Sequence, residues 1–288
     1  MPSRVATARI VGVKIRQSRP GQSDENEQAT QRTSPVDMQV LSGRLFACEA
    51  RTTHKIMNNP QYYSGSNPVI ELDEQARGAF ISRTYMHLFS AISAFVLIEI
   101  ALFQSGLADT IVRGLLGVSW LWVLGGFLVV SWLARGVAHS VESKALQYAA
   151  LAGYVIAEAI IFVPLLYFAN QRADGVITSA AAVTFLGFVG LTLVAFFTRK
   201  DFSFLRGILC WGGIIALLLI VAGVIFGFQL GTYFSVAMVG LAGCAILYDT
   251  SNILHHYRED RHVAAALELF ASVALMFWYV LRIFLSRR

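Results

Sequence analysis

Charged residues are scarce in this sequence. Only 14% of the 288 residues are Asp, Glu, Lys or Arg, whereas 56% are hydrophobic and the mean hydropathy is +0.59. One water-soluble core of this length could not cover so much apolar surface, which points to a lipid bilayer as the solvent. The pI near 9.2 does not indicate a nucleic-acid partner, because no basic face is left once the arginines that flank apolar runs are set aside.

Features that would indicate a disulfide-bonded protein or an enzyme are also missing. The three cysteines form no framework, and Cys210 and Cys244 lie inside apolar runs, where cysteine acts as a small hydrophobic residue. No group of His, Cys and carboxylate residues has metal-ligand spacing, no glycine-rich phosphate loop is present, and no Ser–His–Asp arrangement can be argued. We therefore predict that the protein is not an enzyme and has no cofactor.

Long apolar runs follow one another after residue 80. A helix needs about 20 residues to cross roughly 30 Å of hydrocarbon, and continuous rather than alternating hydrophobicity favours helices over a barrel. The sequence therefore predicts an all-α integral membrane protein with seven transmembrane helices. The predicted spans are residues 83–104, 115–133, 148–169, 176–197, 208–228, 232–248 and 263–285.

The first part of the chain has a different composition. Residues 1–79 are rich in Ser, Thr, Gln, Pro and charge, so we predict a disordered polar cytoplasmic tail before a seven-helix domain at 80–288. The first twenty residues carry five basic side chains and no acid. An organellar transit peptide, a cytoplasmic basic tail, and residues upstream of a start at Met38 or Met57 are the three interpretations.

The basic residues of the loops predict the orientation. With the N-terminus in the cytoplasm, the external loops carry only Arg113 and Arg172, against seven basic residues in the cytoplasmic loops. An odd number of spans then places Arg287 and Arg288 outside, and a re-entrant last segment with both ends inside is the alternative. The seven cytoplasmic residues are Arg135, Lys144, Arg199, Lys200, Arg206, Arg258 and Arg261.

Four carboxylates lie in or beside the apolar runs, where a charge costs at least about 2.5–3.5 kcal/mol. They are Glu99, Glu158, Asp249 and Glu268. Glu99 and Glu158 are placed deepest, Asp249 ends the sixth span, and Glu268 begins the seventh, one turn before Ser272. Protonation, or a partner such as Arg282 or a tyrosine hydroxyl, would explain any one acid. Four together indicate an interior that responds to protons or cations.

Five short segments of the sequence are typical of one family of membrane proteins. Residues 246–250 (ILYDT), 265–270 (AALELF) and 281–284 (LRIF) stand near the C-terminus, with 83–88 (RTYMHL) and 198–205 (TRKDFSFL) upstream. Together they resemble the transmembrane Bax inhibitor motif family, in its bacterial type, over about residues 80–288. The resemblance implies a seven-helix fold in which the last helix is enclosed by the other six.

The resemblance also implies a function. Bacterial members are regarded as pH-sensitive calcium leak channels of the inner membrane, gated by an aspartate at the end of span six and another in span seven. Asp249 matches the first, but the second position is Ser272, which cannot ionise, and the usual Asn three residues later is Leu275. The hypothesis is that Asp249 and Glu268 form a weaker calcium or cation site, and the alternative is that Glu268 only faces headgroup water. Further candidates for an ion pathway or pH sensing are Glu99, Glu158, Ser272 and Arg282.

A second class of function stays open. Other bacterial relatives are thought to act without transport, as membrane modulators of a protease or of a stress-response partner. The loss of a carboxylate at Ser272 favours this alternative. The expected partners are thus the lipid bilayer, calcium or another cation, and, in the alternative, another membrane protein.

Overall fold

Seven long helices make up most of the structure. The computed structural model describes residues 68–140, 143–172 and 174–286, and most of the predicted tail lies outside these ranges. Among the described residues, seven helices are long and apolar enough to cross a membrane, as predicted. The elements are η2 (Val69–Glu71), α2 (Glu74–Gln104), α3 (Leu107–Leu116), α4 (Trp120–Ser140), α5 (Lys144–Arg172), α6 (Val176–Thr198), α7 (Leu205–Phe226), α8 (Gly231–His255), η3 (Glu259–Arg261) and α9 (His262–Ser286).

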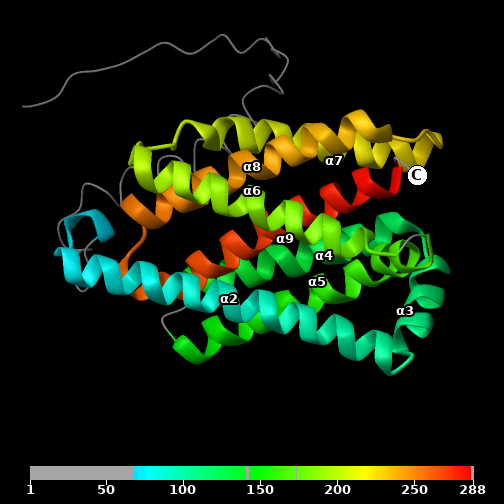
Figure 1. Cartoon of the computed structure of the whole chain (residues 1–288), viewed down its shortest axis with the longest axis horizontal. Helices are drawn as coiled ribbons and strands as arrows, with labels where there is room; N and C mark the ends of the chain where they lie inside the picture. The colour runs from blue at the N-terminus through cyan, green and yellow to red at the C-terminus, as the bar shows by residue number, and fades with distance from the viewer. Residues whose placement is uncertain (1–67, 141–142, 173, 287–288) are drawn as a thin grey trace, which may run out of the picture. The chain divides into compact units, whose positions relative to one another are not determined.

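The last helix lies at the centre of the bundle. α9 packs against α2, α4, α5, α6 and α8, while α7 packs against α8 (Figure 1). In the most apolar stretch of α9, 67% of the residues are buried inside the protein, compared with 6% in the corresponding stretch of α7. Small side chains, including three successive alanines at residues 264–266, let the neighbouring backbones approach α9 closely. The expectation that the last helix is enclosed by the others is confirmed.

Some predicted boundaries are right and others are not. α6 and α9 agree with the predicted spans to within one residue at each end. α2 instead begins at Glu74, where Asp73 caps it by accepting a hydrogen bond from the Ala76 amide, so the domain boundary predicted at 80 falls inside this helix. The short helix α3, between the first two spans, was not predicted.

Two differences matter for the site. The second span was predicted at 115–133, but α4 covers Trp120–Ser140, and the sixth was predicted to end at 248, but α8 continues to His255. In both places the predicted span ends shortly before a charged residue, Arg135 or Asp249. The helices continue because their backbone groups stay hydrogen-bonded, and partners on other helices receive the charged side chains. Arg135 and Asp249 are therefore helical residues well inside α4 and α8.

The loops show how the helices reverse direction. Between α7 and α8, Gly227 and Gly231 have φ of 73° and 63°, which glycine adopts without strain, so the two helices run antiparallel as neighbours. α9 continues as one helix over 25 residues, which supports a complete crossing rather than a re-entrant segment. We call the end of the bundle where α8 leads into α9 the inner end, and the end where α7 leads into α8 the outer end.

Candidate functional site

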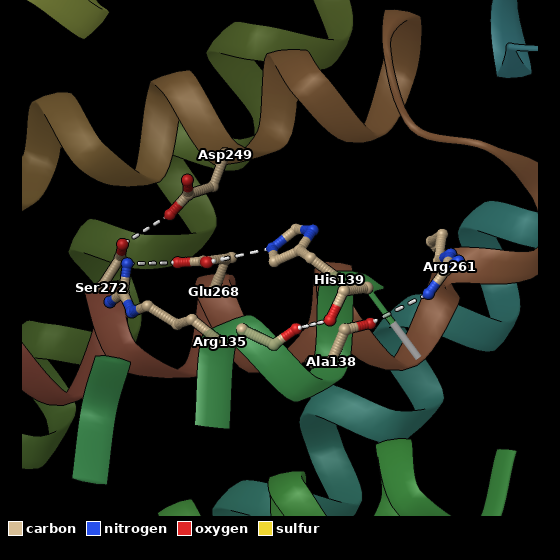
Figure 2. Close-up of polar contacts among 9 residues, drawn as sticks. Arg135, Ala138, His139, Asp249, Arg261, Glu268 and Ser272 are labelled. Atoms are coloured by element: carbon tan, nitrogen blue, oxygen red, sulfur yellow. Dashed lines mark hydrogen bonds and ion pairs between the residues drawn. The ribbon is translucent and has the colours of Figure 1, made fainter. Parts of the chain in front are cut away.

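A polar cluster of α4, α8 and α9 lies near the inner end. Glu268 of α9 forms an ion pair of 2.6 Å from its Oε2 atom to Arg135 Nη1. Its other carboxylate oxygen lies 3.2 Å from His139 Nε2. Arg135 and His139 are four residues apart on α4, which places both on the face toward α9 (Figure 2). Both oxygens of Glu268 are therefore held by one neighbouring helix.

The second part of the cluster joins α8 to α9. The Ser272 hydroxyl donates a hydrogen bond of 2.5 Å to Asp249 Oδ2, and both side chains are buried (Figure 2). The two positions related by the family resemblance are thus in direct contact. Ser272 follows Glu268 by one turn of α9, so the Asp249 and Glu268 carboxylates belong to one cluster.

The loop between α8 and α9 closes over the cluster. The Tyr257 ring stacks on His139 with ring centroids 5.9 Å apart, and Arg261 donates to the Ala138 carbonyl at the end of α4 over 3.5 Å. Burial raises the pKa of the Tyr257 hydroxyl well above its usual range, and the nearby Glu268 and Asp249 carboxylates raise it as well. Tyr257 therefore stays neutral and does not titrate with the cluster.

The segment before α2 covers the same loop. The Val69 amide donates to the Tyr257 carbonyl at 2.8 Å, and Pro68 and Arg258 form an isolated antiparallel bridge. Val69 is fully buried, although the neighbouring Ile70 is exposed. Tyr257 thus has this segment on one side and His139 on the other.

The family motif at residues 198–205 has a structural role in the loop between α6 and α7. Asp201 accepts hydrogen bonds from the amide and hydroxyl of Ser203, which lower the pKa of the Asp201 carboxyl. The amide of Phe202, which lies between Asp201 and Ser203, donates to the Ser251 hydroxyl of α8 at 3.0 Å. The motif therefore fixes this loop to α8, two residues after Asp249.

A cavity of about 1050 Å³ extends from the cluster toward the outer end. It lies between α4, α5, α7, α8 and α9. Arg135, Ser131 and Glu158 line its inner part, and Gln229 and Arg282 line its outer part. Arg135 thus belongs both to the cavity wall and to the ion pair with Glu268.

The structure brings only some of the other predicted residues to this site. Glu158 is buried at the cavity and accepts a hydrogen bond of 3.0 Å from the Tyr154 hydroxyl, the kind of partner expected. Glu99 is buried on α2, and neither of its oxygens has a hydrogen-bond partner among the described residues. It does not line the cavity. Arg282 lies at the opposite end of the cavity from Glu268 and is therefore not its partner.

Arg135 and His139 are site residues that the sequence does not predict. The predicted second span ends at 133, which leaves Arg135 in a loop. Their spacing of four residues at the end of an apolar run is the signal that could have found them, since it places two basic side chains on one helix face. Within the described residues, no group of three or more His, Cys, Asp or Glu could hold a metal ion.

The fold and the cluster define a polytopic helical membrane protein with a carboxylate and arginine site near one end of the bundle. The chain belongs to the Bax1-I family, described as inhibitor of apoptosis-promoting Bax1, whose family model matches residues 77–288. This confirms the family expected from the short motifs.

Curated relatives are found in two bacteria. An uncharacterized protein of Pseudomonas aeruginosa is 35% identical over 122 residues, which cover 41% of this chain and 54% of the relative. Uncharacterized proteins of Neisseria meningitidis serogroups A and B are each 29% identical over 167 residues, covering 56% of this chain and 73% of each relative. The chain therefore spans only about half the length of the Pseudomonas relative that it matches.

Proposed function

We propose that this protein is a pathway for cations, with calcium as the leading candidate, across a bacterial inner membrane. The observation that carries the proposal is the ion pair of 2.6 Å between Arg135 and Glu268, at the inner end of a cavity that reaches the outer end of the bundle. In this state the pathway is closed, because a guanidinium occupies the carboxylate that a cation would need.

Opening requires Glu268 to release Arg135. The freed carboxylate would lie one turn from Ser272, whose hydroxyl binds Asp249. Calcium prefers six to eight oxygen ligands, and two carboxylates with one hydroxyl provide fewer, so water must complete its shell. Because the protein supplies few ligands, it should bind calcium weakly, as a site on an ion pathway must do to release the ion.

Protons and calcium compete for carboxylate oxygens, so calcium occupancy of the site should fall as the pH falls. We expect the flux to respond to pH for this reason.

Calcium flux into proteoliposomes between pH 5 and 8 tests the proposal. Arg135→Gln, which frees the Glu268 carboxylate, should conduct about fivefold faster than the wild type at pH 7, which corresponds to about 1 kcal/mol for a pair whose arginine is half exposed. Glu268→Gln removes the carboxylate that a cation needs and should conduct more slowly than the wild type. Glu259→Gln, an exposed acid of η3, should behave as the wild type.

One observation favours the modulator alternative. Asp249 is bound to the hydroxyl of Ser272, so two carboxylates cannot share a proton or an ion at this contact. The protein would then act on a membrane protease or a stress-response partner without transport. If neither the wild type nor Arg135→Gln conducts at any pH, this alternative replaces the cation pathway.

A further inference from the structure

The cavity has a wall that is open to the bilayer. Leu128 and Trp132 of α4 and Val224 of α7 line it, yet they remain 43%, 75% and 40% exposed. α4 and α7 are also the two long helices least buried by the protein, at 11% and 6% of their most apolar stretches. Acyl chains of the membrane therefore have access to the cavity between α4 and α7.

The lining of this cavity suits a hydrocarbon chain. Apart from the polar residues at its two ends, it consists mainly of Leu, Ile, Val, Phe and Trp side chains from α4, α5, α7, α9 and the loop before α8. Water does not fill apolar cavities well, because it finds too few hydrogen-bond partners there, and an empty cavity forfeits dispersion contacts. An acyl chain supplies these contacts without a polar cost.

The polar groups at the outer end indicate the head group. Arg282 lies one turn before the end of α9, and it forms no ion pair with an acid in the described ranges. Beside it on the cavity wall, the Thr232 hydroxyl donates to Ser286 Oγ at 3.0 Å, and the loop residue Gln229 adds an amide. A guanidinium with hydroxyl and amide donors at the membrane interface is a set that binds phosphate.

The charges of the cavity favour an anionic lipid. Arg135 is neutralised by Glu268, and Glu158 lies at the inner part in a hydrogen bond with Tyr154. Arg282 is therefore the charge that an incoming head group meets first. A phospholipid with a net negative charge complements it, whereas a zwitterionic lipid brings its own cation to the same place.

We propose that the cavity binds an anionic phospholipid, with one acyl chain between α4 and α7 and the phosphate group at Arg282. The inner end of such a chain lies beside Ser131 and Glu158, next to Arg135. The site goes beyond the proposed cation pathway and does not depend on it. Should the pathway conduct, the bound chain would obstruct it from the outer side.

Tryptophan quenching by brominated lipids tests the site. Trp278 lines the cavity and packs against the Phe162 ring at 4.9 Å, whereas Trp211 is exposed on α7 and is absent from the cavity wall. Two full-length proteins are compared, one retaining only Trp278 and one only Trp211, with the other four tryptophans changed to Phe. Each is reconstituted in phosphatidylcholine with a minor fraction of brominated phosphatidylglycerol or brominated phosphatidylcholine.

We expect brominated phosphatidylglycerol to quench Trp278 at about fivefold lower fraction than brominated phosphatidylcholine, the effect of one arginine on an anionic lipid. Trp211, which meets the surrounding lipid, should be quenched equally by both. Arg282→Gln should abolish the preference at Trp278, and Arg282→Lys should keep most of it. Arg113→Gln, an exposed arginine of α3, is the matched control and should change nothing.

Two results would overturn the lipid site. One is a Trp278 that neither brominated lipid quenches, and the other is a preference for phosphatidylglycerol that persists in Arg282→Gln. If Arg282→Gln does not fold, the comparison of Trp278 with Trp211 in the two parent proteins still decides, since equal behaviour at both positions contradicts the proposal.

Discussion

The inner and outer halves of α9 are packed in different ways. In the inner half, residues 263–267 are fully buried, and three of them are alanines, so the surrounding helices close directly on the backbone. In the outer half, Ala271, Ala274 and Trp278 face a cavity of about 1050 Å³. The ion pair of Arg135 and Glu268 lies where the two halves meet, because Arg135 lines the cavity and Glu268 directly follows the closely packed residues. In the proposed pathway this contact closes the inner end of the cavity.

The largest effect should come from enlarging a side chain in the sealed half. Ala266→Leu inserts three carbons where the side chain is fully buried, and overpacking of this kind costs about 1–3 kcal/mol. Ala274→Leu, two turns further along α9, should cost much less because its side chain can extend into the cavity. Unfolding in detergent, followed by circular dichroism, measures both. Equal destabilisation by the two variants would show that the halves do not differ in packing.

The segment that covers the inner end should make a smaller contribution. Val69→Ala removes two methyl groups from a fully buried site beside Tyr257 and should cost about 1–2 kcal/mol in the same unfolding assay. Ile70→Ala, one residue further and 53% exposed, should leave stability within about 0.5 kcal/mol of the wild type. A cost at Ile70 as large as that at Val69 would contradict this packing.

A carboxylate at position 272 should strengthen cation binding at the polar inner end of the bundle, away from the apolar cavity. Ser272→Asp would place a carboxylate at the 2.5 Å contact with Asp249, where two negative charges persist only with a proton or cation between them. We expect about tenfold tighter calcium binding at pH 8 and a steeper loss of binding toward pH 5, measured by calorimetry. Ser272→Ala should bind no more tightly than the wild type. An unchanged affinity in Ser272→Asp would show that this contact is not a cation site.

The inner and outer ends of the bundle should also lie on opposite sides of the membrane. From the basic residues of the loops we propose that the inner end is cytoplasmic. Single cysteines at Lys200 and Arg172, introduced after Cys48, Cys210 and Cys244 are changed to Ser, report the two sides. An impermeant maleimide added to intact cells should label position 172 and not 200. Labelling of both positions from outside would contradict the orientation.

The sequence predicts the number and type of helices well, because a span is encoded locally by its apolar length. It predicts helix ends poorly where a charged residue has a distant partner. Arg135 and Asp249 looked like span ends because their partners on α9 were unknown, and His139 lies 129 residues from the Glu268 that it contacts. The contact between Asp249 and Ser272 was implied only by the family resemblance. The cavity depends on how far α7 stands from α4, which no local pattern encodes.

The most direct test of the account is a double-mutant cycle of calcium flux at pH 7 on Arg135→Gln, Glu268→Gln and the variant carrying both substitutions. If the arginine closes the pathway by occupying the carboxylate, Arg135→Gln should conduct about fivefold faster than the wild type, whereas Glu268→Gln and the double variant, which lack the carboxylate, should conduct more slowly than Arg135→Gln. An Arg135→Gln variant that matches the wild type, or a double variant that conducts as fast as Arg135→Gln, would contradict the claim that this ion pair closes the pathway.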